Sequence, residues 1–562
     1  MKNPVLQSKQ ECRKLILEAF HRCFEKGTLP QAELPSFVVE IPADVSHGDL
    51  ASNAAMASAR VFRRPPRVIA EALLEQLELE GSCFERAEAA GAGFLNFTLS
   101  RRWFSDSLAA VLEEGEDYGR TGYGEGKRIL VEYVSANPTG PMHIGNARGG
   151  AIGDSLASVL DWAGFDVSRE FYVNDAGNQV AKFGHSLELR YLQLYQEGIE
   201  MPEDCYLGAD IIEHAKNFAA LHGDRYVSVS SEERQKALVE YALPLNIAGL
   251  ERDLLKYRIR YDNWFRESTL HENGEARRVV EMLTERGYTY ESEGALWFKA
   301  TDFGADKDFV LVRSNGFLTY VVPDIAYHYN KLVTRGFDRA IDVLGADHHG
   351  YVPRLKAALQ ALGVEPERLD VVLMQMVRLV RGGETVKLSK RSGKAITLVT
   401  LLDEVPIDAA RFYFNLREAN SQFDFDLDLA VEQSSQNPVY YVQYAYARIC
   451  SISARLREEG ILPRPVTAEE LDLLDAPEET ELIRHLAKLP QEIADAARDY
   501  DPARMTRYVI ELATLFHKFY NSHKVLCGEE GRMQARMALC QAVGIALKNV
   551  LTLLKIDAPE RM

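Results

Sequence analysis

The sequence is poor in the features that mark secreted, membrane and metal-binding proteins. Its seven cysteines among 562 residues are scattered and none forms a Cys-x-x-Cys pair, so neither a disulfide framework nor a zinc site is indicated. No apolar run approaches the roughly 20 residues needed to span a bilayer, and the first ten residues lack the apolar core of a signal peptide. We therefore expect a cytoplasmic protein with no membrane partner and no tightly bound metal or organic cofactor.

Positive charge is also in short supply. The formal net charge is −18, which argues against a protein that coats nucleic acid indiscriminately. Local basic tracks remain at residues 63–67 and 387–394, so a specific nucleic-acid contact stays open, although a solvated turn explains residues 63–67 equally well. The length and a hydrophobic content of 46% allow several packed domains.

Hydrophobic periodicity divides the chain into three parts. Residues 1–117 predict a small α/β domain, with strands at 36–41 and 93–98 and helices near 50–60 and 68–79. Residues 118–400 predict a doubly wound, parallel-sheet α/β domain of the Rossmann-like type, with strands at 128–134, 168–173, 309–312, 338–344 and 370–376 and a mostly helical insertion at about 178–290. Beyond residue 401 β-type runs disappear, and the capping-box sequence at 467–470 with heptad-like spacing thereafter predicts an all-α bundle over 401–562.

The most informative segment is residues 136–146, Ala-Asn-Pro-Thr-Gly-Pro-Met-His-Ile-Gly-Asn. It follows a predicted strand and opens into a helix pattern at 147–162. A strand, a tight Gly/Pro loop and a helix N-terminus present free N–H groups and the positive end of a helix dipole to an anion. His143 and Asn146 fall on one face of the first turn. This spacing favours a nucleotide site, with a solvent-exposed, N-capping histidine as the alternative.

A second motif lies far downstream at residues 386–394, Val-Lys-Leu-Ser-Lys-Arg-Ser-Gly-Lys. A basic, glycine-flanked loop with Lys387, Lys390 and Arg391 suits closing over a polyphosphate, whose negative charge grows as an α-phosphate is attacked. The alternative is a solvated basic turn.

Together the two motifs resemble the His-Ile-Gly-His and Lys-Met-Ser-Lys-Ser signatures of class I aminoacyl-tRNA synthetases, in the same order and with a similar separation. Asn146 replaces the second histidine of the first signature, and Leu388 and Arg391 replace the methionine and last serine of the second. Asn146 can still donate a hydrogen bond but cannot become cationic, so His143 is the better candidate for stabilising charge. Segments spread over the whole chain resemble the bacterial arginyl-tRNA synthetases in particular, at residues 131–140, 170–177, 324–328, 344–350, 424–428, 437–448 and 558–562.

The resemblance implies a monomeric arginine–tRNA ligase that activates L-arginine with ATP and Mg²⁺, releases pyrophosphate, and transfers arginine to the 3′ end of tRNA(Arg) with release of AMP. The catalytic residues would be His143, Asn146, Lys387 and Lys390. The ATP site would comprise the rest of the first signature with parts of three other segments, namely Ala136, Pro138, Thr139, Gly140, Pro141, Met142, Ile144, Gly145, Asp347, His348, Met376, Val377 and Ser389. The arginine site would comprise Glu132, Ser135, Asn137, Tyr320 and Asp324.

Arginine recognition requires carboxylates, because a guanidinium offers several donors and a fixed charge. A glutamate such as Glu132 inside an apolar strand is costly unless it is paired. Tyr320 and Asp324 are one helical turn apart and, without the resemblance, would pass as a surface pair. The turn at 347–349, Asp-His-His, would alternatively hold a metal, but no third ligand with suitable spacing accompanies it.

Two regions are expected to contact tRNA. The resemblance implies that the N-terminal domain, through residues 46–56, touches the outer corner of the tRNA. Tyr440, Tyr444 and Arg448 follow one another at i, i+4 spacing on a predicted helix, where the rings would stack on anticodon bases and the guanidinium would bind phosphate or base. A buried aromatic stripe explains the same spacing.

Two other functions compete with this interpretation. One is a different class I synthetase or a small adenylyltransferase with the first signature, which the long helical C-terminus and the Lys390 loop oppose. The other is a catalytically silent tRNA-binding paralogue, which the presence of His143 and Lys390 disfavours.

Overall fold

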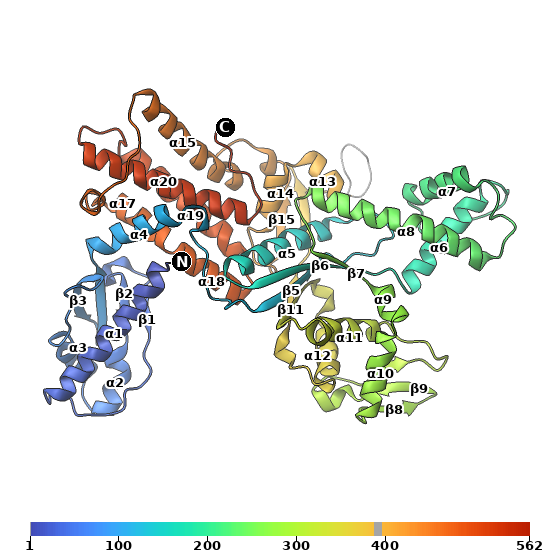
Figure 1. Ribbon diagram of the computed structural model, residues 1–562, viewed down its shortest axis with the longest axis horizontal. Helices are drawn as coiled ribbons and strands as arrows, with labels where there is room; N and C mark the ends of the chain where they lie inside the picture. Colours follow the sequence, from blue (N-terminus) through green and yellow to red (C-terminus); the bar gives the residue numbers. More distant parts are fainter. Residues whose placement is uncertain (1, 387–395) are drawn as a thin grey trace.

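The computed structural model describes residues 2–386 and 396–562. Figure 1 shows a small N-terminal domain at one end of an elongated molecule, a parallel sheet at its centre and a helical C-terminal part above it, with further helices projecting on the far side of the sheet. Within the described residues no helix is both long and apolar enough to span a membrane.

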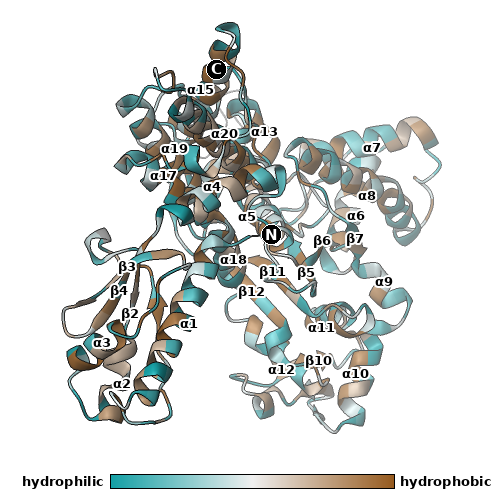
Figure 2. Cartoon of the chain, turned by 60° about the vertical axis from the view of Figure 1, so that its left-hand side comes forward, coloured by the Kyte–Doolittle hydropathy of each residue, from teal (hydrophilic) through white to brown (hydrophobic). Residues whose placement is uncertain are grey.

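The N-terminal domain packs helices on an antiparallel sheet of order β1-β2-β4-β3. Its elements are α1 (Pro4–Glu25), β1 (Val39–Glu40), β2 (Leu50–Ser52), α2 (Ala54–Phe62), α3 (Pro66–Leu74), β3 (Phe84–Ala90) and β4 (Phe94–Leu99). In the hydropathy view α1 carries both hydrophilic and hydrophobic turns, as a helix with one buried face should (Figure 2).

Two expectations for this domain were wrong in detail. The predicted helix near residues 50–60 begins only at Ala54, because residues 50–52 pair with β4 and are buried. The predicted strand at 36–41 shrinks to β1, because its neighbours bind side chains instead of a strand. Arg13 donates to the Phe37 carbonyl, and the Val38 N–H donates to Asn53 Oδ1.

The central sheet has five parallel strands in the order β12-β11-β5-β6-β7. Its strands are β5 (Arg128–Tyr133), β6 (Asp166–Val173), β7 (Asn263–Arg266), β11 (Arg339–Gly345) and β12 (Leu369–Met374). On one side of the sheet β5 is followed by β6 and β7, and on the other side β11 is followed by β12. The strand order therefore reverses between the neighbours β5 and β11. In such sheets ligands bind in the crevice outside the carboxyl ends of the strands at this reversal.

Helix α5 (Ile144–Trp162) connects β5 to β6 and is buried along most of its length. It approaches β5 closely at Gly153, where an added Cβ would lie 2.3 Å from Tyr133 Cγ. Because Tyr133 is itself fully buried, neither residue has room to move. A glycine is therefore required at this contact.

We expect Gly153→Ala to lower the free energy of unfolding by about 1–3 kcal/mol or more, as overpacking does in a well-packed core. Gly149→Ala on the same helix is the matched control, since its Cβ would meet Met374 Cε at an ordinary 3.5 Å. Alanine should stabilise that helical position slightly. Thermal unfolding of both variants checks this, and equal melting temperatures would show that α5 packs differently.

Between β6 and β11 the chain leaves the sheet twice. The first excursion is helical, through α6 (Asn178–Leu192), α7 (Ala209–His222) and α8 (Ser231–Lys256). The second contains α9 (Glu267–Glu272), α10 (Glu275–Glu285), β8 (Thr289–Ser292), β9 (Ala295–Phe298), β10 (Phe309–Val312) and α11 (Val321–Tyr329), which continues into a π-helical turn (Asn330–Thr334). Helix α12 (Val352–Ala361) then joins β11 to β12.

Two strands in this region differ from expectation. The run at 309–312 was predicted for the parallel sheet, but β10 pairs antiparallel with β9 in a separate sheet of order β10-β9-β8. A short apolar run does not show which sheet it joins. The stretch at 178–290, predicted to be mostly helical, also contains β7, which pairs with β6 in the central sheet.

The C-terminal part is mainly helical. After β12 a small sheet of order β14-β13-β15 is formed by β13 (Val377–Arg381), β14 (Glu384–Thr385) and β15 (Phe423–Asp426). The helices are α13 (Leu398–Glu404), α14 (Ile407–Phe414), α15 (Pro438–Glu458), α16 (Ala468–Leu471), α17 (Pro477–Ala487), α18 (Leu489–Asp499), α19 (Ala503–Ser522) and α20 (Glu530–Leu553). The capping box at Thr467 and Glu470 is confirmed, since each side chain accepts the other's backbone N–H.

The expectation that β structure ends at residue 401 was wrong, because β15 pairs in parallel with β13. Its Phe-Asp-Phe-Asp alternation buries Phe425 and leaves Asp424 on the outside, as on a half-exposed strand. Helix α4 (Arg101–Glu114) packs against α17 and α20, and the Tyr118 hydroxyl donates to the Leu486 carbonyl. The link from the N-terminal domain is therefore held by the C-terminal helices.

Candidate active site

A cleft of about 1170 Å³ lies at the carboxyl ends of β5, β6, β11 and β12, where the strand order reverses. It is lined by polar and charged side chains of the second excursion as well as by the loops that follow the strands. Of the residues predicted from the sequence, those that line it are Glu132, Ser135, Gly145, Asn146, Tyr320, Asp324, His348 and Met376.

The chain leaves β5 through a strained turn. Val134 and Ser135 both have left-handed backbone angles, with φ of 74° and 41°, which non-glycine residues seldom adopt. Two contacts hold the turn, because the Tyr261 hydroxyl donates to the Tyr133 carbonyl and the Tyr172 N–H donates to Ser135 Oγ. Strain of this kind persists where the surroundings fix it, and it often accompanies a binding site.

The first signature ends at the N-terminus of α5. The helix begins at Ile144, three residues earlier than its apolar pattern indicated, with His143 exposed at the N-cap. Asn146 Oδ1 accepts the His143 backbone N–H at 3.0 Å. This contact uses the oxygen of the Asn146 amide and leaves its NH₂ group as the part that can donate to a phosphate.

The described chain just after the second signature contacts the first signature through the backbone. Lys387, Ser389, Lys390 and Arg391 lie outside the described residues. The chain that follows them lies against the first signature, since the Leu398 N–H donates to the Met142 carbonyl and Thr397 pairs with His143 in an antiparallel bridge. The segment that follows the second motif, from Thr397 onward, is therefore held beside the start of α5.

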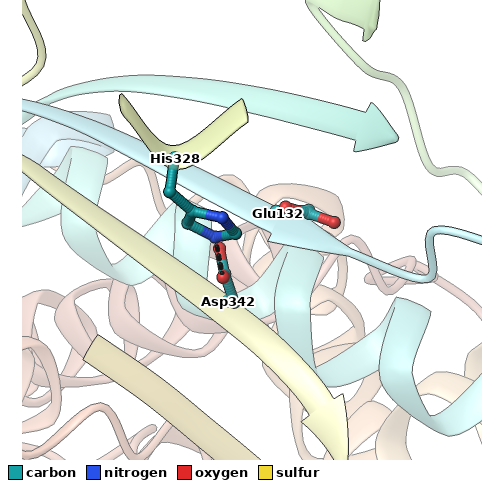
Figure 3. Close-up of side chains that lie close together, drawn as sticks. All are labelled: Glu132, His328 and Asp342. Carbon is teal, nitrogen blue, oxygen red and sulfur yellow. Dashed lines mark hydrogen bonds and ion pairs between the residues drawn. The ribbon is translucent and has the colours of Figure 1, made fainter. Parts of the chain in front are cut away.

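A group of mostly buried charges lies at the inner wall of the cleft. Glu132 on β5 and Asp342 on β11 are direct neighbours in the parallel register, and both are buried. The Lys331 ammonium bridges them, 2.5 Å from Glu132 Oε2 and 2.9 Å from Asp342 Oδ1. Figure 3 shows His328 meeting Asp342 in the same group, with Glu132 on the adjacent strand. Glu132, a sequence candidate for contacting arginine, is thus paired with an internal lysine.

Asp324 and Tyr320 lie where α11 borders the cleft. The Tyr320 side chain is 73% exposed and its ring stacks near that of Tyr351, whereas the Asp324 side chain is 30% exposed. His328 Nδ1 lies 3.2 Å from Asp324 Oδ1, and Tyr351 adds a hydrogen bond. Burial acts to raise the pKa of Asp324, but His328 outweighs it and holds this pKa below its ordinary value. Asp324 is therefore an anchored carboxylate, unlike an ordinary surface residue.

Sequence reasoning missed several charged residues of the site. Asp342 lies in an apolar strand, as Glu132 does, and the same argument about buried carboxylates would have found it. Glu267 also lines the cleft, where it accepts the Tyr172 hydroxyl at 2.9 Å. No pattern in the sequence around Glu267 indicated that this residue lines the cleft.

Other predicted residues lie around the cleft instead of lining it. The remaining members of the first signature and the two outer nucleotide candidates are in this group, namely Ala136, Asn137, Pro138, Thr139, Gly140, Pro141, Met142, His143, Ile144, Asp347 and Val377. The Pro138 carbonyl accepts Asn246 of α8, which ties the signature loop to the helical insertion. Arg148 of α5 donates to the Gln375 carbonyl, next to Met376.

The aromatic residues predicted to contact tRNA form a surface stack on α15. The rings of Tyr440 and Tyr444 are 6.2 Å apart and nearly parallel, and Tyr444 is 37% exposed. The Arg448 guanidinium donates to the Tyr444 hydroxyl and lies 4.8 Å over the Tyr520 ring. The alternative explanation of this spacing was a buried aromatic stripe. The partly exposed side chain of Tyr444 does not fit that explanation.

Three family models match successive parts of the chain. They are the arginyl tRNA synthetase N terminal domain over residues 10–99, the catalytic domain of tRNA synthetases class I (R) over residues 107–426, and the DALR anticodon binding domain over residues 442–562. The catalytic model covers more than half of the chain and includes the parallel sheet with its cleft. The fold and the catalytic domain are those of a class I aminoacyl-tRNA synthetase.

Relatives along the full length give the specificity. The chain is 54% identical over 562 residues to the arginine–tRNA ligase of Caldanaerobacter subterraneus subsp. tengcongensis and 49% identical over 564 residues to that of Acetivibrio thermocellus, covering 100% of each partner and of itself. The solved arginyl-tRNA synthetase of Thermus thermophilus shares the fold, with a TM-score of 0.74 at 23% identity over 99% of this chain and 100% of that one. The chain belongs to the arginyl-tRNA synthetase family and is an enzyme of that family. This excludes the small adenylyltransferase and other class I specificities.

Proposed function

We propose that the cleft is the place where this chain activates L-arginine with ATP and from which it passes arginine to the 3′ end of tRNA(Arg). The observation that carries the proposal is the anchored carboxylate of Asp324, which faces the same cleft as the N-terminal turn of α5. A guanidinium needs a fixed anion, and a phosphate needs helix N–H groups. The cleft offers both.

In the proposed first step the arginine carboxylate attacks the α-phosphorus of ATP in line, and the bond to pyrophosphate breaks. In the second step a 3′-terminal hydroxyl of the tRNA attacks the arginyl carbonyl, and AMP leaves. Neither step requires a nucleophilic side chain of the protein, so the residues act by positioning and by stabilising charge. ATP enters as its Mg²⁺ complex, with no tightly bound metal or organic cofactor of the protein itself.

The phosphates are assigned to the two signatures. His143, Asn146 and the N-terminus of α5 would hold them, and Lys387 with Lys390 would neutralise the departing pyrophosphate. Gly145 would let the adenosine approach the backbone. Further ATP contacts are proposed for Ala136, Pro138, Thr139, Gly140, Pro141, Met142, Ile144, Asp347, His348, Met376, Val377 and Ser389.

The amino acid is assigned to the opposite wall of the cleft. Asp324 would meet the guanidinium, and the exposed Tyr320 ring would cover it. Ser135 and Asn137, in and after the strained turn, would orient the reacting end of arginine. Glu132 also lines the cleft and is assigned to the arginine site in a supporting role, because its carboxylate is already paired with Lys331.

For tRNA we propose contacts at both ends of the molecule. Residues 46–56 of the N-terminal domain would meet its outer corner, and Tyr440, Tyr444 and Arg448 the anticodon. The corresponding domain division is 1–117, 118–400 with an insertion at about 178–290, and 401–562. We propose that the protein acts as a monomer in the cytoplasm.

The proposal predicts that arginine, among the twenty amino acids, is charged onto total tRNA, and that arginine-dependent ATP–pyrophosphate exchange requires tRNA. The tRNA requirement follows from the family resemblance. Both are measured with purified protein in the presence and in the absence of tRNA. The control is tRNA oxidised at its 3′ end, which cannot be charged. Charging of another amino acid would refute the specificity, and robust exchange without any tRNA would refute the requirement.

A further inference from the structure

The charges at the inner wall of the cleft alternate in sign. Glu132 and Asp342 are adjacent in the register of β5 and β11, and two such carboxylates cannot both ionise in a buried sheet without a cation between them. The Lys331 ammonium supplies that cation, and its side chain has no exposed surface. Lys331 lies on the π-helical turn that follows α11, a local geometry that is frequent at functional sites.

His328 supplies a second cation. Its Nδ1 faces the Asp324 backbone carbonyl at 2.8 Å and Asp324 Oδ1 at 3.2 Å, and its Nε2 faces Asp342 Oδ2 at 2.6 Å. The acceptors lie closer to both ring nitrogens than the one nearby donor, the Lys331 ammonium at 3.4 Å from Nε2, and this arrangement favours an imidazolium that donates from both nitrogens. Burial and Lys331 act to lower the pKa of His328, but Asp342 and Asp324 outweigh them and raise it to about 10.

We propose that His328 and Lys331 are positioning residues for arginine recognition, which occupy the inner carboxylates of Glu132 and Asp342 so that Asp324, the most exposed carboxylate of the group, is the one offered to the substrate guanidinium. The five groups form one chain, Asp324, His328, Asp342, Lys331, Glu132, which carries a single net negative charge when all are ionised and is most exposed to the cleft at Asp324. This inference rests on the proposed role of Asp324. A guanidinium neutralises that end and completes the alternation.

The same arrangement determines which cations are kept out. Ligand atoms of Glu132, His328 and Asp342 lie within 4.8 Å of one another, a grouping that would otherwise suit a metal ion. The Lys331 ammonium already bridges the two carboxylates, so neither a divalent cation nor the ammonium of a substrate lysine can settle there. Lysine would then have to use Asp324, where one ammonium matches the site less well than a planar guanidinium.

The test removes the internal ammonium. Lys331→Ala frees Glu132 and Asp342 to draw in cations and releases Asp324 from its fixed geometry. We expect kcat/KM for arginine and the arginine-to-lysine ratio of kcat/KM each to fall by about tenfold or more, the usual scale for one charged hydrogen bond, while the KM for ATP stays near its wild-type value. Methylammonium at millimolar concentration should restore arginine activity, and tetramethylammonium, which has no N–H to donate, should not.

Lys555→Ala is the matched control. Lys555 also places an ammonium on a fully buried carboxylate, 3.0 Å from Asp154 Oδ1, but Asp154 does not line the cleft. This variant should leave the KM for arginine and the discrimination against lysine unchanged. A similar loss in both variants would mean that removing any lysine paired with a buried carboxylate disturbs the enzyme, and would overturn the inference.

A double variant separates positioning from folding. Lys331→Ala with Glu132→Gln removes one charge of each sign and keeps Asp342 on His328, so it should fold and recover most of the arginine-to-lysine ratio even where the single variant does not fold. Failure of the double variant and of methylammonium to restore the ratio overturns the inference, as does wild-type behaviour of Lys331→Ala. If instead Asp324→Asn leaves arginine kinetics intact, the proposed arginine pocket itself is wrong.

Discussion

Asp324→Asn should lower kcat/KM for arginine by about 30- to 1000-fold, equivalent to about 2–4 kcal/mol for a charged partner lost from a mostly buried site. The substitution keeps the shape of the side chain and removes its charge, so the guanidinium loses its anion while the hydrogen bond from Tyr351 still has an acceptor. His328 then keeps only Asp342 as a charged partner. The arginine-to-lysine ratio of kcat/KM should fall as well, because paired donors no longer meet a carboxylate.

Steady-state kinetics with arginine and lysine, for the wild type and the variant, check this. Asp370→Asn is the matched control, because the Asp370 side chain has a similar exposure of 27% and is paired with Arg339, yet it lies at the amino end of β12, away from the cleft. It should leave both kinetic values unchanged. Unchanged values for Asp324→Asn would place the guanidinium pocket elsewhere in the chain.

Lys390→Ala should reduce the rate of arginine activation by about 10²–10³-fold, the size typical of one preorganised electrostatic contact. We assign Lys390 to negative charge that develops on the departing pyrophosphate, so the loss should appear in kcat, with arginine binding nearly intact. Single-turnover formation of the adenylate measures the first quantity, and equilibrium binding of arginine measures the second.

The flanking Lys394→Ala, in the same basic segment, serves as the comparison and should cause a much smaller loss. Near-normal turnover of Lys390→Ala with a need for more arginine would contradict the assignment of the second signature. Equal losses in the two variants would instead indicate a general effect of positive charge in the segment.

The strands of the central sheet were predictable from the sequence where the local pattern is strong. The run at 128–134 is apolar, is bounded by Gly/Pro loops and leads into the helix pattern of α5, and β5 confirms it. The apolar run of β10 was placed in the wrong sheet, because partner choice depends on the hairpin that β8 and β9 form before it. Strand β15 was missed because its four residues have a partner only in β13, which the local sequence does not show.

The candidate site also contains parts that were predictable from the sequence and parts that were not. The first signature was identified because its residues are consecutive and their geometry follows from one strand, one loop and one helix. The charge chain was not, because Glu132 and Asp342 become neighbours only through the register of β5 and β11, and Lys331 reaches both from a π-helical turn that no local pattern indicated. The need for a partner to Glu132 was predictable, but its identity depended on tertiary structure.

The pairing of β5 with β11 also constrains when the enzyme can fold during its synthesis. The Arg128 N–H, at the start of β5, donates to Asp338, which lies 210 residues further along the chain. At a synthesis rate of about 5–20 residues per second, β5 and β6 wait about 10–40 s before β11 leaves the ribosome. Throughout that interval the edge of β5 that β11 later covers, which begins at the backbone N–H and carbonyl of Arg128, presents unpaired backbone groups on an apolar strand, a template for another nascent chain. The residues synthesised between β6 and β11 therefore set the length of the period in which this edge of the enzyme is exposed to aggregation.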